Sequence, residues 1–425
     1  MTLRTVPLAI YAAATGLLEP LAPMLLARRA RAGKEDAARL NERLGRPTTP
    51  RPPGPLVWLH GVSVGESLSL LPLIAALRAA RPDLAILVTS GTVTSAEVLA
   101  KRLPPGVIHQ FAPVDAPGAA ARVLDHWKPA AILLVESELW PNLIVAAKAR
   151  GVKLALLSAR MTEDSAAGWR QAAGTARALL QAFDLILPQD DATERRLSRL
   201  GARVGPHLNL KLASAAPPVD EAALAALRRG VGARKVVLAA STHPGEEALI
   251  AEAFREATAD GPPALLIVAP RHPDRGPAVT ALLLDLGFIT ARRGAGDAIE
   301  PRTGAYVADT LGELGVFYTL ADVVIMAGGF VEGVGGHNPI EAAQLARPLV
   351  TGPHVFNAEA IYAEMRADAA VLAAADGAAL ARHIAGLLAN PTIARRTGEA
   401  AQAYAARQGA ALAQAMTLIA PLLPA

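Results

Sequence analysis

The sequence predicts an α/β protein with two domains, each built on a parallel sheet. Apolar segments of strand length alternate with segments of helical periodicity from residue 56 onward, as in parallel sheets covered by helices on both faces. The segment ASAAPPV at 213–219 interrupts this alternation, which resumes at residue 235. The length of 425 residues suits two domains at roughly 150 residues or more each.

The first half contains the predicted strands 56–60, 84–89, 107–111, 131–135, 153–157 and 184–188. The predicted helices between and after them are 67–80, 93–102, 117–127, 141–149 and 190–199. Asp190 and Asp191 open the last of these helices, so we interpret them as capping residues rather than as a metal motif.

The second half repeats the pattern with predicted strands at 235–240, 264–269, 305–308, 323–327 and 348–351. The predicted organisation is an N-terminal segment 1–34, a first α/β domain 35–212 and a second one 213–425, whose last helix could pack back on the first. Ligands of such sheets bind beyond the carboxyl ends of the strands, so we expect the site in the cleft between the domains.

The composition excludes several classes of site. The chain has no cysteine, which rules out disulfides, thiolate nucleophiles and Cys-based zinc or iron–sulfur centres. The formal net charge is only +4, and no long basic stripe with interleaved aromatic residues is visible, so we expect no nucleic-acid partner. The chain is 52% hydrophobic but 4% aromatic, which predicts a large aliphatic core.

The N-terminal segment is apolar and then basic. Residues 5–18 carry no charge, and Glu19, Pro20 and Pro23 interrupt the apolar run before the about 20 residues that a spanning helix needs. Basic residues follow at Arg28, Arg29, Arg31 and Lys34. We expect an amphipathic or short signal-anchor segment, with the basic cluster at anionic headgroups on the cytoplasmic side. A cleaved signal peptide and a buried helix are the alternatives.

Residues 61–65 read G-V-S-V-G, which matches the G-x-S-x-G elbow of serine hydrolases. Ser63, Asp309 and His337 also follow the required chain order. However, this elbow would lie on the first strand of its domain, with its acid and base in the other domain. The turn could instead deliver Glu66 to the next helix, either as a general base or as a carboxylate that only stabilises the helix dipole.

Further motifs stand along nearly the whole chain. They are R-A-G-K-E-D at 31–36, H-G-V-S-V-G-E-S at 60–67, E-S-E-L-W-P-N at 136–142, S-A-R-M-T at 158–162, A-S-T-H-P-G-E-E at 240–247, A-P-R-H-P-D-R at 269–275, D-T-L-G-E-L at 309–314, G-G-H-N-P-I-E-A-A at 335–343 and G-P-H-V-F-N at 352–357. In this order and spacing they resemble the family of Kdo transferases, which move 3-deoxy-D-manno-oct-2-ulosonic acid (Kdo) from CMP-Kdo to the lipid A precursor.

The resemblance implies the GT-B glycosyltransferase fold, with two Rossmann-like domains that bind the acceptor (first domain) and the nucleotide sugar (second domain). It implies that Glu66 is the base that deprotonates the acceptor hydroxyl in an inverting, metal-independent reaction. It also assigns transition-state support to Glu136 and Lys211, with Glu138 as the less favoured carboxylate.

The surroundings of Lys211 depart from the family pattern. Leu208 and Ala213 stand where the family usually has Gly and a nearby Asp. A solvated linker lysine is therefore the alternative interpretation of Lys211.

The resemblance assigns donor binding to residues of the second domain. They are Arg271, His272, Gly312, Glu313, Leu314, Asn338, Pro339, Ile340 and Glu341. Arg271 and His272 end a predicted strand, where cations would offset the charge of the leaving phosphate. The glycine-rich run before Pro339 opens a predicted helix with free N–H groups. Phe330 replaces a usual Ser after two glycines, which could alter a donor contact.

We therefore expect an enzyme that transfers Kdo from CMP-Kdo to the lipid A precursor lipid IVA, without a cofactor or a metal, at the cytoplasmic side of the inner membrane. Another nucleotide-sugar enzyme of the same architecture, such as an epimerase, is one alternative. A membrane-bound binding protein without activity is another.

Overall fold

The computed structural model describes residues 5–213 and 216–424. Its contacts divide the chain into two compact units, one formed by Met1–Ser214 with Gln408–Ala425 and the other by Ala215–Arg407. Residues 214 and 215 of the predicted linker 213–219 lie outside the described residues. So do residues 1–4 of the predicted N-terminal segment.

The first unit is built on a six-stranded parallel sheet with the order β3-β2-β1-β4-β5-β6. The strands are β1 (Leu56–His60), β2 (Ala85–Ser90), β3 (Ile108–Phe111), β4 (Ala131–Val135), β5 (Lys153–Ala159) and β6 (Leu185–Pro188). All six predicted strands are confirmed to within about two residues. The strand order reverses between β1 and β4, and ligands of open α/β sheets bind at such a switch point.

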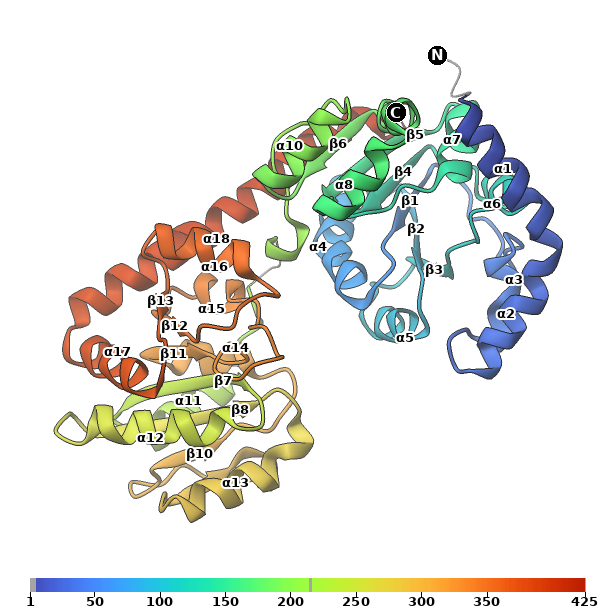
Figure 1. Cartoon of the computed structure of the whole chain (residues 1–425). Coiled ribbons are helices and arrows are strands. Elements are labelled where there is room, and N and C mark those ends of the chain that lie inside the picture. The colour runs from blue at the N-terminus through green and yellow to red at the C-terminus, as the bar shows by residue number, and fades with distance from the viewer. Residues whose placement is uncertain (1–4, 214–215, 425) are drawn as a thin grey trace. The chain divides into compact units, whose positions relative to one another are not determined.

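Helices cover both faces of this sheet (Figure 1). They are α4 (Val64–Ala80), α5 (Val93–Arg102), α6 (Pro117–Trp127), α7 (Pro141–Ala149), α8 (Glu163–Arg170), α9 (Ala173–Leu180) and α10 (Asp191–Arg199). Alternate residues of β1 point to opposite faces, because Trp58 packs in the core with α6 and α7 whereas Leu59 packs with α4 and α5. Burial on both faces explains why these strands are continuous apolar runs.

The N-terminal helical run continues further than the sequence predicts. It comprises α1 (Val6–Leu18), a 3-10 turn at Glu19–Leu21 and α2 (Ala22–Arg31). Pro20 and Pro23 do not end it, because each lies in the first turn of the segment that it opens, where the missing N–H is not needed. The run of 26 residues is long and apolar enough to cross a membrane by length and composition. It is largely exposed, so the alternative of a buried helix is wrong.

One face of this run is attached to the first unit. The side chains that make the attachment are Thr5 (to Thr175, 3.1 Å), Leu8 (buried), Tyr11 (to Asp115, 3.1 Å), Thr15 (to Asn142, 3.0 Å) and Glu19 (to Arg122, 2.7 Å). Their spacing of three or four residues places them on one side of the helix. Glu19 also accepts a hydrogen bond from Gly118 N at 2.9 Å, so it caps α6. A short element, α3 (Leu40–Arg43), follows α2.

The second unit is built on a seven-stranded parallel sheet with the order β13-β12-β11-β7-β8-β10-β9. The strands are β7 (Lys235–Thr242), β8 (Ala264–Pro270), β9 (Thr290–Arg292), β10 (Ala305–Val307), β11 (Val323–Met326), β12 (Leu349–Thr351) and β13 (Leu372–Ala373). Five of them match predicted segments. The sequence does not predict β9 and β13, which lie at the two edges and have three and two residues.

The helices of the second unit are α11 (Glu221–Val231), α12 (Glu246–Thr258), α13 (Gly276–Asp285), α14 (Leu314–Leu320), α15 (Ile340–Gln344), α16 (Glu359–Ala367) and α17 (Gly377–Ala389). A long helix, α18 (Pro391–Ile419), follows, and its residues from Gln408 onward are grouped with the first unit. Ala415 and Ile419 of α18 belong to the core cluster that contains Val57 and Leu59 of β1.

Candidate active site

Glu66 lies in the first turn of α4, just beyond the carboxyl end of β1. Its Oε2 accepts a hydrogen bond from Val62 N at 2.8 Å, and its Oε1 accepts one from Ser63 Oγ at 2.7 Å. A side chain at Gly61 would place its Cβ 3.1 Å from Glu66 Cβ, so the glycine leaves room for the glutamate. The half-buried carboxylate is thus held in one orientation by the turn G-V-S-V-G.

The hydrogen bonds of the three hydrolase candidates do not support a triad. Ser63 Oγ caps α4 and donates to Glu66. The Asp309 carboxylate accepts from Arg292 at 3.2 Å and from Gly294 N at 2.6 Å. His337 Nε2 lies 3.0 Å from His243 Nε2. Each candidate side chain is therefore engaged with a partner other than the one a Ser-His-Asp hydrolase requires.

Glu136 and Lys211 form an ion pair, with Lys211 Nζ 2.5 Å from Glu136 Oε1. Glu136 follows β4, is 6% exposed and has a φ of 65°, a left-handed conformation that non-glycine residues rarely adopt. Its main chain is fixed on both sides by hydrogen bonds to Leu157 O and from Arg160 N. The unusual backbone therefore turns this carboxylate toward the lysine.

Lys211 lies in a 3-10 turn at Leu210–Leu212 whose neighbours anchor it. Asn209 Oδ1 accepts a hydrogen bond from Lys211 N at 3.2 Å, and Leu208 and Leu210 are buried in the core of the first unit. A Cβ on Gly65 would lie 3.9 Å from Lys211 Cε, so the lysine chain passes the turn that carries Glu66. Lys211 is exposed to solvent, but its ammonium pairs with Glu136 and its chain lies beside the turn that carries Glu66.

Glu138, the less favoured carboxylate of its motif, has a different set of neighbours. Trp140 Nε1 donates a hydrogen bond to Glu138 Oε2, and His60 Nε2 lies 3.6 Å from the same oxygen. The His60 ring meets the Trp140 ring edge to face at 4.8 Å, and His60 Nδ1 lies 2.8 Å from Thr89 Oγ1. Sequence reasoning missed His60 and Trp140, although both stand inside the quoted motifs.

Arg271 and His272 follow β8 and are both exposed. Arg271 N donates to Thr242 O at 3.0 Å, which holds this turn beside the end of β7. Burial lowers the pKa values of His243 and His337, and the charge of Arg271 contributes. The His243 ring lies 6.2 Å from the His272 ring, so these four side chains share one region of the second unit. An exposed guanidinium beside an exposed imidazole at the carboxyl end of a parallel strand can bind an anionic ligand.

Gly312 and Glu313 form the turn before α14, which begins at Leu314, and Gly312 has a φ of 83°. The Glu313 carboxylate accepts two hydrogen bonds from Arg293, at 2.6 and 3.1 Å, and another from Thr310. The bonds from Arg293 lower the pKa of Glu313. Because the carboxylate is engaged in this way, main-chain groups of the turn remain the natural contacts for a ligand.

Asn338 and Pro339 lead into α15, a helix of only five residues that begins with Ile340 and Glu341. Asn338 Oδ1 accepts a hydrogen bond from Ile340 N at 3.0 Å, and the Ile340 side chain is fully buried. The expected row of free N–H groups is therefore partly capped, and the Ile340 side chain packs in the core. Glu341 is half-buried. The pKa of the neighbouring Tyr318 is raised mainly by the burial of Tyr318 itself and next by the negative charge of Glu341.

Sequence reasoning also missed a pair of imidazoles beside this segment. His243 and His337 stack with ring centroids 5.1 Å apart. Their two Nε2 atoms lie 3.0 Å apart, so one imidazole donates a hydrogen bond to the other. Burial lowers the pKa of His337 to about 4, with contributions from His243 and Arg271. The pair is therefore neutral near pH 7.

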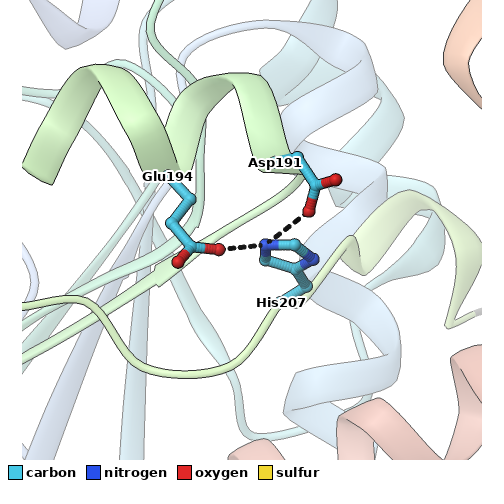
Figure 2. A group of neighbouring side chains, drawn as sticks. All are labelled: Asp191, Glu194 and His207. Carbon is cyan, nitrogen blue, oxygen red and sulfur yellow. Dashed lines mark hydrogen bonds and ion pairs between the residues drawn. The ribbon is translucent and has the colours of Figure 1, made fainter.

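One group of side chains within the described parts of the chain is close enough to share a metal ion. Figure 2 shows Asp191 and Glu194 on α10 facing His207 on the following loop, with their ligand atoms within 4.8 Å of one another. His207 Nε2 lies 2.7 Å from Glu194 and 3.6 Å from Asp191. Asp190 caps α10 as predicted, accepting from Thr193 N at 2.7 Å. The hydrogen bond between His207 and Glu194 accounts for this exposed arrangement, which ties the loop before Lys211 to α10.

Solved structures with the same architecture show the fold. A glycosyltransferase from Rickettsia africae matches with a TM-score of 0.57 at 12% identity, covering 87% of this chain and 98% of that one. A UDP-GlcNAc 2-epimerase from Neisseria meningitidis matches with a TM-score of 0.56 at 11% identity, covering 86% of this chain and 100% of that one. The predicted GT-B fold with two Rossmann-like units is confirmed.

The comparison of sequences is more specific. A family model described as 3-deoxy-D-manno-octulosonic-acid transferase (kdotransferase) matches residues 38–214. The chain is 35% identical to the 3-deoxy-D-manno-octulosonic acid transferase of Bordetella pertussis, covering 95% of this chain and 96% of that one. It is 37% identical to a probable mitochondrial enzyme of the same name from Arabidopsis thaliana, covering 81% and 79%. The chain belongs to the Kdo transferase family and is a glycosyltransferase.

Proposed function

We propose that this enzyme transfers Kdo from CMP-Kdo to a sugar hydroxyl of the lipid A precursor lipid IVA, with inversion at the Kdo anomeric carbon and without a metal ion. Membership of the family supports Kdo transfer. The observation that carries the mechanism is the fixed Glu66 carboxylate, on a turn that the side chain of Lys211 passes on its way to Glu136.

Glu66 is the proposed general base. Each of its oxygens accepts one hydrogen bond from the G-V-S-V-G turn, and a carboxylate oxygen has a further lone pair that can accept the proton of an acceptor hydroxyl. Removing that proton as the oxygen attacks the Kdo anomeric carbon is the step that a positioned carboxylate accelerates. A single attack with loss of CMP from the opposite side inverts the configuration.

Lys211 and Glu136 are proposed to support the transition state. The ion pair orients a cation beside the turn that carries the base, and such a charge acts without reorganisation as negative charge develops. Glu136 orients the lysine, because its backbone is locked by two hydrogen bonds. Arg271 and His272 in the second unit are proposed to bind the CMP phosphate, and Glu341 the ribose hydroxyls.

We further propose that the run Val6–Arg31 lies along the cytoplasmic surface of the inner membrane. The face opposite its attachment carries exposed apolar side chains, which are Val6, Ile10, Leu17, Leu18, Leu21, Met24 and Leu25. The basic residues Arg28, Arg29 and Arg31 close the run. An apolar stripe followed by arginines fits the interface of an anionic bilayer. A helix with one side bonded to a folded unit cannot be surrounded by lipid, which favours lying on the bilayer over spanning it.

Mass analysis of lipid IVA after incubation with CMP-Kdo tests the reaction. We expect a mass increase of one or more Kdo units that persists in EDTA, and the anomeric configuration of the product, read by NMR, should be opposite to that of the donor. UDP-GlcNAc in place of CMP-Kdo should give neither transfer nor epimerisation. Failure to modify lipid IVA, or full dependence on a metal, would contradict the proposal.

Vesicle binding tests the membrane surface. The double variant Leu17→Glu with Met24→Glu removes apolar side chains that are 82% and 62% exposed, so we expect it to lose sedimentation with phosphatidylglycerol vesicles. The matched control is Leu284→Glu with Ile289→Glu, which changes two exposed apolar side chains of the second unit. Equal loss in both variants would contradict a specific role for the N-terminal run.

A further inference from the structure

A fully buried carboxylate lies at the start of α12. Glu246 is 0% exposed, and the hydrogen bonds that it accepts come from backbone N–H groups. They are donated by His243 at 2.9 Å, by Gly328 at 2.7 and 2.8 Å, and by Phe330 at 2.9 Å. Burying a charged group is costly unless such bonds replace its water shell. The sequence places Glu246 in the first turn of a helix, where a carboxylate is usually exposed.

The three donors belong to the ends of two neighbouring strands. His243 directly follows β7, while Gly328 and Phe330 follow β11, and β7 pairs with β11 in the sheet. Gly328 has a φ of 81°, and a Cβ there would lie 2.8 Å from the His337 ring. The carboxylate thus fixes a tight turn that needs glycine both for its conformation and for the space that His337 occupies.

Two contacts connect the turn held by Glu246 to the segment that leads into α15. Gly336 N donates to Gly328 O at 2.8 Å, so the turn held by Glu246 holds the chain just before His337. His337 Nε2 also lies 3.0 Å from the Nε2 of His243, whose own backbone N–H is bonded to Glu246. The residues just before Asn338 are therefore held by two contacts, and both contacts are made by groups that are bonded to the Glu246 carboxylate.

We propose that Glu246 is a positioning residue for the donor-binding segment Asn338–Glu341, acting through the turn Gly328–Phe330 and through the contact between His243 and His337. The proposal rests on the donor-binding role proposed above for this segment. It assigns to Glu246 an effect on the affinity for the nucleotide sugar and none on the affinity for the acceptor. The peptide N–H of Phe330 takes part, so the replacement of the usual Ser by Phe leaves this bond intact.

The variant Glu246→Gln tests the proposal. Both carboxylate oxygens accept bonds from N–H groups, so an amide of the same size must turn its NH2 group toward at least one of these donors. We expect the KM for CMP-Kdo and the Kd for CMP, measured by calorimetry on the full chain, to rise at least about tenfold, which is 1.4 kcal/mol. The KM for the acceptor should stay within about twofold.

Two matched controls separate positioning from general damage. Glu252→Gln changes an exposed carboxylate of the same helix, and Glu247→Gln changes the adjacent buried one, which pairs with Arg275 at 2.6 Å. Both should keep the wild-type Kd for CMP. A loss of active protein in Glu246→Gln with an unchanged Kd would show a purely structural role and overturn the proposal.

A further variant keeps the test decisive if Glu246→Gln does not fold. His243→Phe removes the imidazole contact with His337 and leaves the buried carboxylate and its bonds in place. It should raise the Kd for CMP at least about threefold, and an unchanged Kd would overturn the proposal. Wild-type protein without affinity for CMP or CMP-Kdo would instead contradict the proposed donor itself, so the two failures are distinct.

Discussion

Lys211 Nζ lies 2.5 Å from Oε1 of Glu136, a carboxylate that is nearly inaccessible to solvent. The pair joins a 3-10 turn at residue 211 to the end of β4 and stands beside the turn of Glu66. Removing one partner of such a pair leaves the other charge poorly compensated, and the two side chains should act as a unit.

Lys211→Met should lower the rate of Kdo transfer by about 10²-fold or more, as the loss of a preorganised charge in an active site does. The double variant with Glu136→Gln should be no slower than the single variant, because the glutamate acts by orienting the lysine. Steady-state kinetics of the four proteins in this cycle measure the coupling. Additive losses would mean that the residues act independently.

Ser63→Ala should leave transfer within about tenfold of the wild-type rate, because Ser63 supports Glu66 and is not a nucleophile. The lost cap of α4 should reduce the free energy of unfolding by about 1 kcal/mol. Thr92→Ala is the matched control, since Thr92 caps α5 through Ser95 N and should cost similar stability with no change in rate. Abolished transfer in Ser63→Ala alone would revive the nucleophile interpretation.

The stability of the first unit should fall on acidification because of His109. Burial lowers the pKa of His109 from 6.5 to about 4, with a contribution from Arg39. The unfolded chain therefore binds this proton first, and the free energy of unfolding falls as the pH drops from about 6.5 to about 4, by on the order of 2–3 kcal/mol. Denaturation at pH 7 and pH 4.5 should show a smaller fall for His109→Gln than for the wild type. Equal falls would contradict this assignment.

Gly352→Ala should destabilise the second unit by more than about 3 kcal/mol. Its Cβ would lie 2.1 Å from the carbonyl oxygen of Gly329, and neither backbone can move without disturbing β11 and β12. Gly386→Ala is the control, because Gly386 lies inside α17 with nothing within 4 Å of the added Cβ. That variant should gain about 0.5–1 kcal/mol. Thermal unfolding of both variants measures the difference.

The sequence predicts the buried central strands well, because parallel strands covered on both faces are continuous apolar runs. It does not predict β9, which reads Thr-Ala-Arg at a sheet edge, or β13, which has two residues. It also ends the N-terminal run too early, because proline is tolerated in the first turn of each new helical segment.

For the candidate site too, the sequence predicts some residues and not others. Glu66 and Glu136 are found because each follows a clear strand within a recognisable motif. Glu246 is not found, since its burial depends on N–H groups that lie 82 and 84 residues further along the chain. The contact between His243 and His337 joins residues 94 positions apart, and no local sequence pattern predicts it.

The most direct test of the account is the rate of Kdo transfer by Glu66→Gln, measured together with the Kd for CMP-Kdo. Losing the general base should slow transfer by about 10²–10⁴-fold, while the Kd stays within about twofold. Glu97→Gln, an exposed carboxylate on α5, should match the wild type in both measurements. Transfer by Glu66→Gln at close to the wild-type rate would contradict the assignment of Glu66 as the base.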